Sequence, residues 1–98
     1  MDRKLIWTET ASRQMWEMLT FLDEHDAKKA SEKLYSNIQK KIGILLNYPE
    51  IGRFLKGRKT IQYYPIDPSH RIYYRVRGNT LIISAFFNLK QDLSKRPF

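Results

Sequence analysis

The sequence predicts an α+β domain in which an antiparallel two-helix hairpin packs on one face of an antiparallel sheet. Apolar residues recur at steps of three or four through residues 9–47, which is the spacing of amphipathic helices. Further along, apolar and polar residues alternate on both sides of Gly78-Asn79, a two-residue hairpin signal. The predicted order is an N-terminal strand, two helices and a C-terminal three-stranded meander. Because both helices must bury an apolar stripe, they should share one face of the sheet.

The composition fits one small domain spanning residues 1–98. The chain has 98 residues, no cysteine and a formal net charge of +8. Without cysteine there is neither a disulfide nor a thiolate zinc site, which fits a reducing cytoplasm. No apolar run approaches the length of a membrane span, so we expect neither a transmembrane segment nor a signal peptide.

The positive charge gathers in the second half of the chain. Residues 1–52 contain eight basic and eight acidic residues, whereas residues 53–98 contain ten basic residues against Asp67 and Asp92. A basic half on a small domain suggests a polyanion or an acidic protein as partner.

The first half predicts a strand followed by a helical hairpin. Residues 4–7 form a short apolar strand, and Thr8 is placed to cap a helix over residues 9–24. Asp26 is placed to cap a second helix over residues 27–47. So short a connection makes the two helices antiparallel, and we interpret the hairpin as scaffold.

A clear break follows the second helix at residues 48–53 (YPEIGR), where proline cannot extend a helix and glycine frees the turn. Residues 56–59 (KGRK) then form a basic loop without the spacing of a known nucleotide motif. Residues 60–64 alternate as a strand. We expect its Thr60, Gln62 and Tyr64 side chains on the sheet face away from the helices.

The central strand covers residues 69–77 (SHRIYYRVR) and has the clearest alternation in the chain. Its apolar face carries Ile72, Tyr74 and Val76, and its polar face carries Arg71, Tyr73, Arg75 and Arg77. With Gly78-Asn79 as the turn, the predicted pairs are Val76–Leu81, Tyr74–Ile83 and Ile72–Ala85 on one face and Arg75–Ile82, Tyr73–Ser84 and Arg71–Phe86 on the other. Residues 88–98 should form a basic tail.

The sheet face away from the helices is therefore predicted to be basic, with aromatic residues between the cations. Arginine forks suit phosphate, and an aromatic ring can stack on a base. The candidate contacts to nucleic acid or to a partner protein are Arg53, Lys56, Arg58, Tyr64, Arg75, Phe86 and Lys90.

Cleavage of RNA would need a base, an acid and cations that hold the phosphorane. Arg71 could hold the phosphate and Tyr73 could transfer a proton, so these two are the catalytic candidates if the protein is a nuclease. Alternation puts His70 on the helix-packed face, where we expect it to pack or to cap. The sequence has no carboxylate pair, metal cluster or nucleophile triad, and it predicts no metal and no small-molecule cofactor.

Over nearly its whole length the chain resembles the RelE/ParE superfamily of bacterial type II toxins. The resemblance rests on the order of the elements, on YPEIGR at residues 48–53 and on HRIYYR at residues 70–75. A Pro-x-x-Gly-Arg motif after the second helix is typical of the ParE-like and plasmid-stabilisation branch. The resemblance implies a cytoplasmic toxin neutralised by an antitoxin that wraps it. An acidic, partly disordered antitoxin would suit the basic surface.

The resemblance leaves two modes of action open. ParE-like members poison DNA gyrase, here by binding alone, and the motif at residues 49–53 favours this mode. RelE-like members cut mRNA on the ribosome and carry an arginine at the position that matches Arg71. In that mode Arg71 and Tyr73 would be catalytic, with Arg75 and Lys90 as phosphate contacts. A non-toxic basic binding domain is the third alternative.

Overall fold

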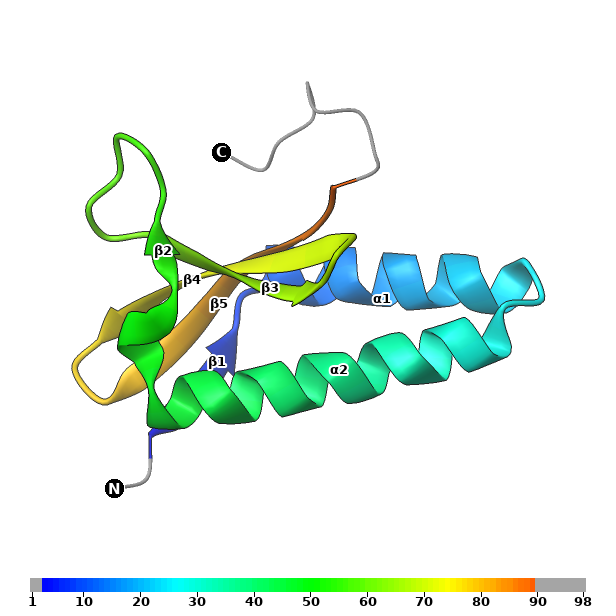
Figure 1. Cartoon of the computed structure of the whole chain (residues 1–98), viewed down its shortest axis with the longest axis horizontal. Helices are drawn as coiled ribbons and strands as arrows, with labels where there is room; N and C mark the ends of the chain where they lie inside the picture. The colour runs from blue at the N-terminus through cyan, green and yellow to red at the C-terminus, as the bar shows by residue number, and fades with distance from the viewer. Residues whose placement is uncertain (1–2, 90–98) are drawn as a thin grey trace.

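Two helices cover one face of a five-stranded sheet (Figure 1), and the computed structural model describes residues 3–89. In chain order the elements are β1 (Lys4–Trp7), α1 (Glu9–Glu24), α2 (Lys28–Asn47), the 3₁₀ helix η1 (Pro49–Ile51), β2 (Arg53–Phe54), β3 (Gln62–Asp67), β4 (His70–Arg77) and β5 (Thr80–Asn88). The strands lie in the order β1-β5-β4-β3-β2, with α1 against β5 and α2 against β3. The predicted α+β class and the helical layer on one face are confirmed.

The helical hairpin forms as the apolar spacing predicts. The Thr8 hydroxyl oxygen accepts a hydrogen bond from the Ala11 amide at 3.1 Å and caps α1. The predicted cap at Asp26 is wrong. This residue takes a φ of 56° and makes the left-handed turn between the helices, so α2 starts at Lys28 without a side-chain cap.

The main core lies between the helices and the inner face of the sheet. Its members are buried apolar side chains from both layers: Ala11, Met15, Leu19, Leu34, Ile38, Ile42, Leu45, Ile66, Ile72, Tyr74, Leu81, Ile83 and Phe86. Of the three residues that alternation predicts on the inner face of β4, Ile72 and Tyr74 lie in this core, whereas Val76 is 38% exposed near the end of the strand.

The expectation of a wholly antiparallel sheet is wrong at one edge, and the other edge carries a short strand that was not expected. β1 runs parallel to β5, with the Lys4 amide 2.9 Å from the Asn79 carbonyl and the Thr8 amide 3.0 Å from the Ile83 carbonyl. At the other edge the two-residue strand β2 pairs antiparallel with β3. Neither strand is long enough for its sequence to show which neighbour it joins.

The predicted register between β4 and β5 holds for only half of the hairpin. Val76 pairs with Leu81 and Tyr74 with Ile83, as expected, but Tyr73 then pairs with Ala85. Ser84 is the extra residue of a β-bulge, and its carbonyl accepts a hydrogen bond from the Thr8 hydroxyl at 3.2 Å. A shift of one residue moves every following side chain of the strand to the opposite face of the sheet.

A second, smaller core occupies the sheet face away from the helices. Ile61, Tyr73, Ala85 and Phe87 are buried there, with Leu55, Tyr63 and Leu89 packed against them. The expected open basic face is therefore apolar at its centre, and its cations lie around that centre. Within residues 3–89, no helix is both long and apolar enough to cross a membrane.

Candidate functional site

On the outer face of β4, Tyr73 is buried, whereas Arg71 and Arg75 line two separate hollows. Tyr73 is only 3% exposed and belongs to the second core. Arg71 lines a hollow beside β2 and β3, whereas Arg75 lines another beside the start of α1. The structure therefore places Arg71 and Tyr73 together, and Arg75 apart from them.

Arg71 lies against two aromatic rings. Its guanidinium carbon is 4.6 Å from the centre of the Tyr63 ring and 5.7 Å from that of Tyr73, within the range of cation–π attraction. Its Nε is enclosed and has no hydrogen-bond partner in the described part of the chain. A buried N–H of this kind favours an incoming acceptor such as a carboxylate or a phosphate oxygen.

Arg71 and Arg53 line the same hollow, which we call the basic pocket. It has a volume of about 440 Å³. Its lining consists of two arginines with apolar and aromatic side chains: Ile51, Arg53, Tyr63, Tyr64, Pro65, Arg71 and Leu89. With two cations and no carboxylate in its wall, the pocket suits an anionic group flanked by apolar surface.

Buried hydrogen bonds hold the Pro49-to-Arg53 motif against the sheet. The Tyr74 hydroxyl donates to the Pro49 carbonyl at 2.6 Å and accepts from the Gly52 amide at 3.0 Å. The Gln62 side-chain amide donates to the Gly52 carbonyl at 2.9 Å. Burial raises the pKa of Tyr74 to about 12, so the hydroxyl stays protonated. The motif thus fixes the chain that brings Arg53 to the basic pocket.

His70 closes the turn into β4. Its Nδ1 lies 2.9 Å from an Asp67 carboxylate oxygen, which also accepts from the Ser69 and His70 amides at 2.7 and 2.8 Å. Burial alone would raise the pKa of Asp67, but the hydrogen bonds from His70 and Ser69 and the charge of His70 lower it below its ordinary value of 3.8. The His70 ring stacks on Phe86, with centroids 5.6 Å apart. The predicted packing role of His70 is confirmed.

Two predicted contact residues lie on the other face of the sheet. Phe86 is 3% exposed in the main core, because the bulge at Ser84 turns it toward the helices. Tyr64 pairs with Ile72 and packs partly against the main core, although its edge reaches the basic pocket. The face assignment of β3 was wrong because Gln62, polar but buried, bonds to the Pro49-to-Arg53 motif instead of facing solvent.

Two further predicted contacts lie outside the basic pocket. Lys56 and Arg58 are exposed on the loop between β2 and β3. Asn88 of the predicted tail ends β5 and Leu89 packs on the second core, whereas Lys90 and residues 91–98 lie outside the described residues.

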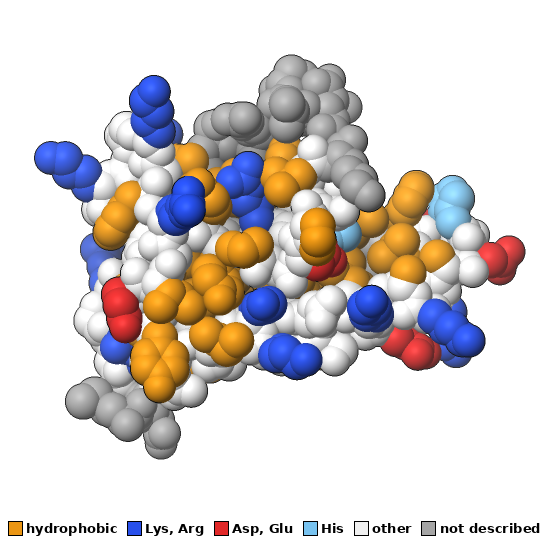
Figure 2. Space-filling view, viewed as in Figure 1, with side chains coloured by type: hydrophobic (Ala, Val, Ile, Leu, Met, Phe, Trp, Pro, Cys, Tyr) orange, Lys and Arg blue, Asp and Glu red, His pale blue; other side chains and the backbone are white. Residues whose placement is uncertain are grey.

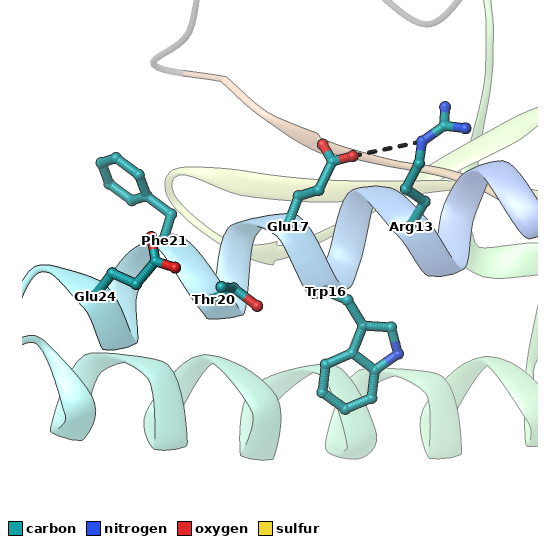
Figure 3. Close-up of a pocket in the computed structure, with 6 residues that line it drawn as sticks. All are labelled: Arg13, Trp16, Glu17, Thr20, Phe21 and Glu24. Carbon is teal, nitrogen blue, oxygen red and sulfur yellow. Dashed lines mark ion pairs between the residues drawn. The ribbon is translucent and has the colours of Figure 1, made fainter.

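Another hollow lies along α1, on the side of the helix away from the main core (Figure 3). Its lining is Arg13, Trp16, Glu17, Thr20, Phe21 and Glu24, and Arg13 pairs with Glu17 at 3.5 Å. Trp16 points toward α2 and stacks on Tyr35 with ring centres 6.4 Å apart. The Trp16 side chain is 55% exposed.

The fold resembles solved toxins of bacterial toxin–antitoxin systems. A chain of the "chromosomal ParDE TA system from P. aeruginosa" is 14% identical with a TM-score of 0.74, over 90% of this chain and 97% of that chain. A "YoeB/ParE toxin from Agrobacterium tumefaciens" is 24% identical with a TM-score of 0.61, over 87% and 96% of the two chains. The YoeB dimer from Staphylococcus aureus gives 18% identity and a TM-score of 0.61 over 87% and 94%. At these identities the likeness shows the fold alone.

Sequence comparison identifies the family. No curated protein matches the chain. The profile described as "ParE toxin of type II toxin-antitoxin system, parDE" matches residues 5–93, nearly the whole chain. The protein therefore belongs to the ParE toxin family of type II toxin–antitoxin systems, within the RelE/ParE superfamily.

Proposed function

We propose that this toxin stops growth by binding DNA gyrase, without catalysing a reaction of its own. The burial of Tyr73 carries this proposal. A nuclease needs a proton donor or acceptor that reaches the substrate beside the phosphate-holding cation. Tyr73 is 3% exposed, and the Nδ1 of His70 bonds to Asp67 while its Nε2 is enclosed. Arg71 is therefore better explained as a binding residue than as part of a catalytic pair.

The basic pocket is the proposed contact surface. An Asp or Glu side chain of the target could enter between Arg53 and Arg71, and the unpartnered Nε of Arg71 could donate to it. Membership of a type II toxin–antitoxin family implies an antitoxin as a second partner. We infer that this antitoxin is acidic, covers the same pocket and acts in the cytoplasm, where gyrase works.

A supercoiling assay tests the gyrase proposal. Purified toxin should block the ATP-dependent supercoiling of relaxed plasmid by gyrase, and Arg71→Ala should weaken inhibition about tenfold, since it removes a partly desolvated charged contact. Arg77→Ala is the matched control, because it removes the same side chain from an exposed position of the same strand that does not line the basic pocket. Relaxation by topoisomerase I should be unaffected, which separates a gyrase effect from coating of the plasmid. The proposal is wrong if supercoiling proceeds normally while expression of the toxin still stops growth.

A ribosome-dependent endoribonuclease is the second candidate. Arg71 favours it, because an enclosed, unpartnered guanidinium N–H beside two aromatic rings also suits a phosphodiester and its base. In a translating extract, wild-type toxin should then cut mRNA, and Arg71→Ala should reduce cleavage at least about 100-fold by removing transition-state charge stabilisation. Primer extension would locate the cuts. An intact message in the presence of wild-type toxin would exclude this candidate.

A further inference from the structure

The loop between β2 and β3 carries a dense group of cations. Lys56, Arg58 and Lys59 lie in the loop, Arg53 lies in β2 just before it, and residues 51–66 contain no carboxylate. All four are exposed. Figure 1 shows the loop projecting from the sheet at the upper left, and Figure 2 shows Lys and Arg side chains extending there. We call residues 55–61 the basic loop.

Backbone hydrogen bonds give the basic loop a defined shape. The Leu55 amide donates to the Ile61 carbonyl at 2.8 Å and closes the loop, and the Arg58 amide donates to the Leu55 carbonyl at 2.9 Å. Gly57 has a φ of 81°, which lets the chain turn tightly between them. Leu55 and Ile61 also pack in the second core. Because the loop is anchored in this way, its cations can bind an anion with less loss of conformational entropy.

The composition of the loop favours contacts to the phosphates of a duplex over stacking on the bases of a single strand. The loop is a turn that projects from the edge of the sheet, so its cations can reach a phosphate backbone from outside. Single strands are gripped by several aromatic side chains between cations, whereas residues 55–61 (LKGRKTI) contain no aromatic residue and one exposed ring, Phe54, lies beside them. The nearby Tyr63 and Tyr73 rings pack against each other, with centres 6.0 Å apart, and against Arg71.

We propose that the basic loop binds the phosphate backbone of duplex DNA, so that the toxin engages gyrase while gyrase is on its DNA. The choice of DNA over another polyanion rests on the proposed gyrase function. The basic loop would then contact the DNA, and the basic pocket would contact the enzyme.

Fluorescence anisotropy with purified toxin and a labelled DNA duplex of about two helical turns tests this inference without gyrase. If the three cations of the basic loop contact phosphates, log K should fall against log salt with a slope of about −2.7. The variant K56Q/R58Q/K59Q should bind at least about tenfold more weakly at low salt, with the slope reduced by about 2.7. Both effects follow from the loss of three phosphate contacts.

The matched control K28Q/K29Q/K33Q removes the same charge from exposed positions at the start of α2, at the other end of the molecule in Figure 1. It should change affinity less than about threefold, because these lysines do not contact the duplex. Equal losses in the two variants, or tighter binding of single-stranded RNA than of duplex DNA, would overturn the inference. A toxin that inhibits gyrase but fails this test would leave the proposed function standing. One that binds duplex DNA through the loop but spares gyrase would fail the proposed function alone.

Discussion

Gly52→Ala should destabilise the protein by about 2–4 kcal/mol, as expected for overpacking combined with the loss of a buried hydrogen bond. A Cβ atom at this position would overlap the Tyr74 hydroxyl oxygen and lie 2.7 Å from the ring carbons Cε1 and Cζ. The φ of Gly52 is −71°, which any residue can adopt, so space and not backbone conformation requires glycine here. Tyr74 cannot withdraw easily because it is fully buried between the helices and the sheet.

Urea unfolding followed by circular dichroism would measure this loss. Gly43→Ala is the control, since a Cβ atom there has nothing within 4 Å and alanine favours a helix interior by up to about 1 kcal/mol. The two glycine substitutions should therefore change the free energy of unfolding in opposite directions. Equal stability of wild type and Gly52→Ala would show that the motif does not pack on Tyr74 as described.

The sequence predicts the long elements of the fold and not the short strands at the edges of the sheet. Periodic signals were sufficient for α1, α2 and β4, because each is long enough to show its buried face over several repeats. The order of β1 and β2 in the sheet depends on contacts with residues far along the chain, such as the pairing of Lys4 with Thr80. A four-residue and a two-residue strand contain no local signal for such partners.

The candidate site was predicted less well than the fold. Arg71 lies on the outer face, as its alternation indicates, and Arg53 reaches the same pocket. The burial of Tyr73 could not be inferred, because it depends on the second core that Ile61 and Phe87 form across the sheet. The register shift at Ser84 follows no local pattern in the sequence of β5. For the same reason the sequence placed Phe86 on the outer face of the sheet, whereas it lies in the main core.

The hydrogen bonds between the Tyr74 hydroxyl and the Pro49-to-Arg53 motif could not be inferred from the sequence either, because they join residues that are 22 and 25 positions apart. A buried tyrosine on an apolar strand face is a usable signal, since its hydroxyl must find a partner. Gln62 gives a second signal of the same kind. Together they mark a place where a polar turn packs onto the sheet, and the Pro49-to-Arg53 motif is that turn.

Tyr74→Phe should cost about 1–3 kcal/mol, the penalty for leaving a buried donor without an acceptor. The Gly52 amide loses its partner, and the Pro49 carbonyl keeps only the longer bond from Gln62, at 3.4 Å. Tyr35→Phe is the control, because Tyr35 is 42% exposed and its stacking on Trp16 does not use the hydroxyl. The double variant Gly52→Ala/Tyr74→Phe should lose less stability than the sum of the two single losses, since both substitutions break the same contact.

The pH dependence of stability gives an independent test of the same hydroxyl. Its pKa is about 12 in the folded protein against 10.0 for an ordinary tyrosine, so the unfolded chain ionises first. The hydroxyl's contribution is therefore complete below pH 10 and is lost as the pH rises toward 12. The stability difference between wild type and Tyr74→Phe should shrink across that interval, while every other titrating group is common to both proteins. A stability difference that stays constant from pH 9 to pH 12 would mean that Tyr74 ionises equally in the folded and unfolded chains. The hydroxyl would then not be buried against the Pro49-to-Arg53 motif.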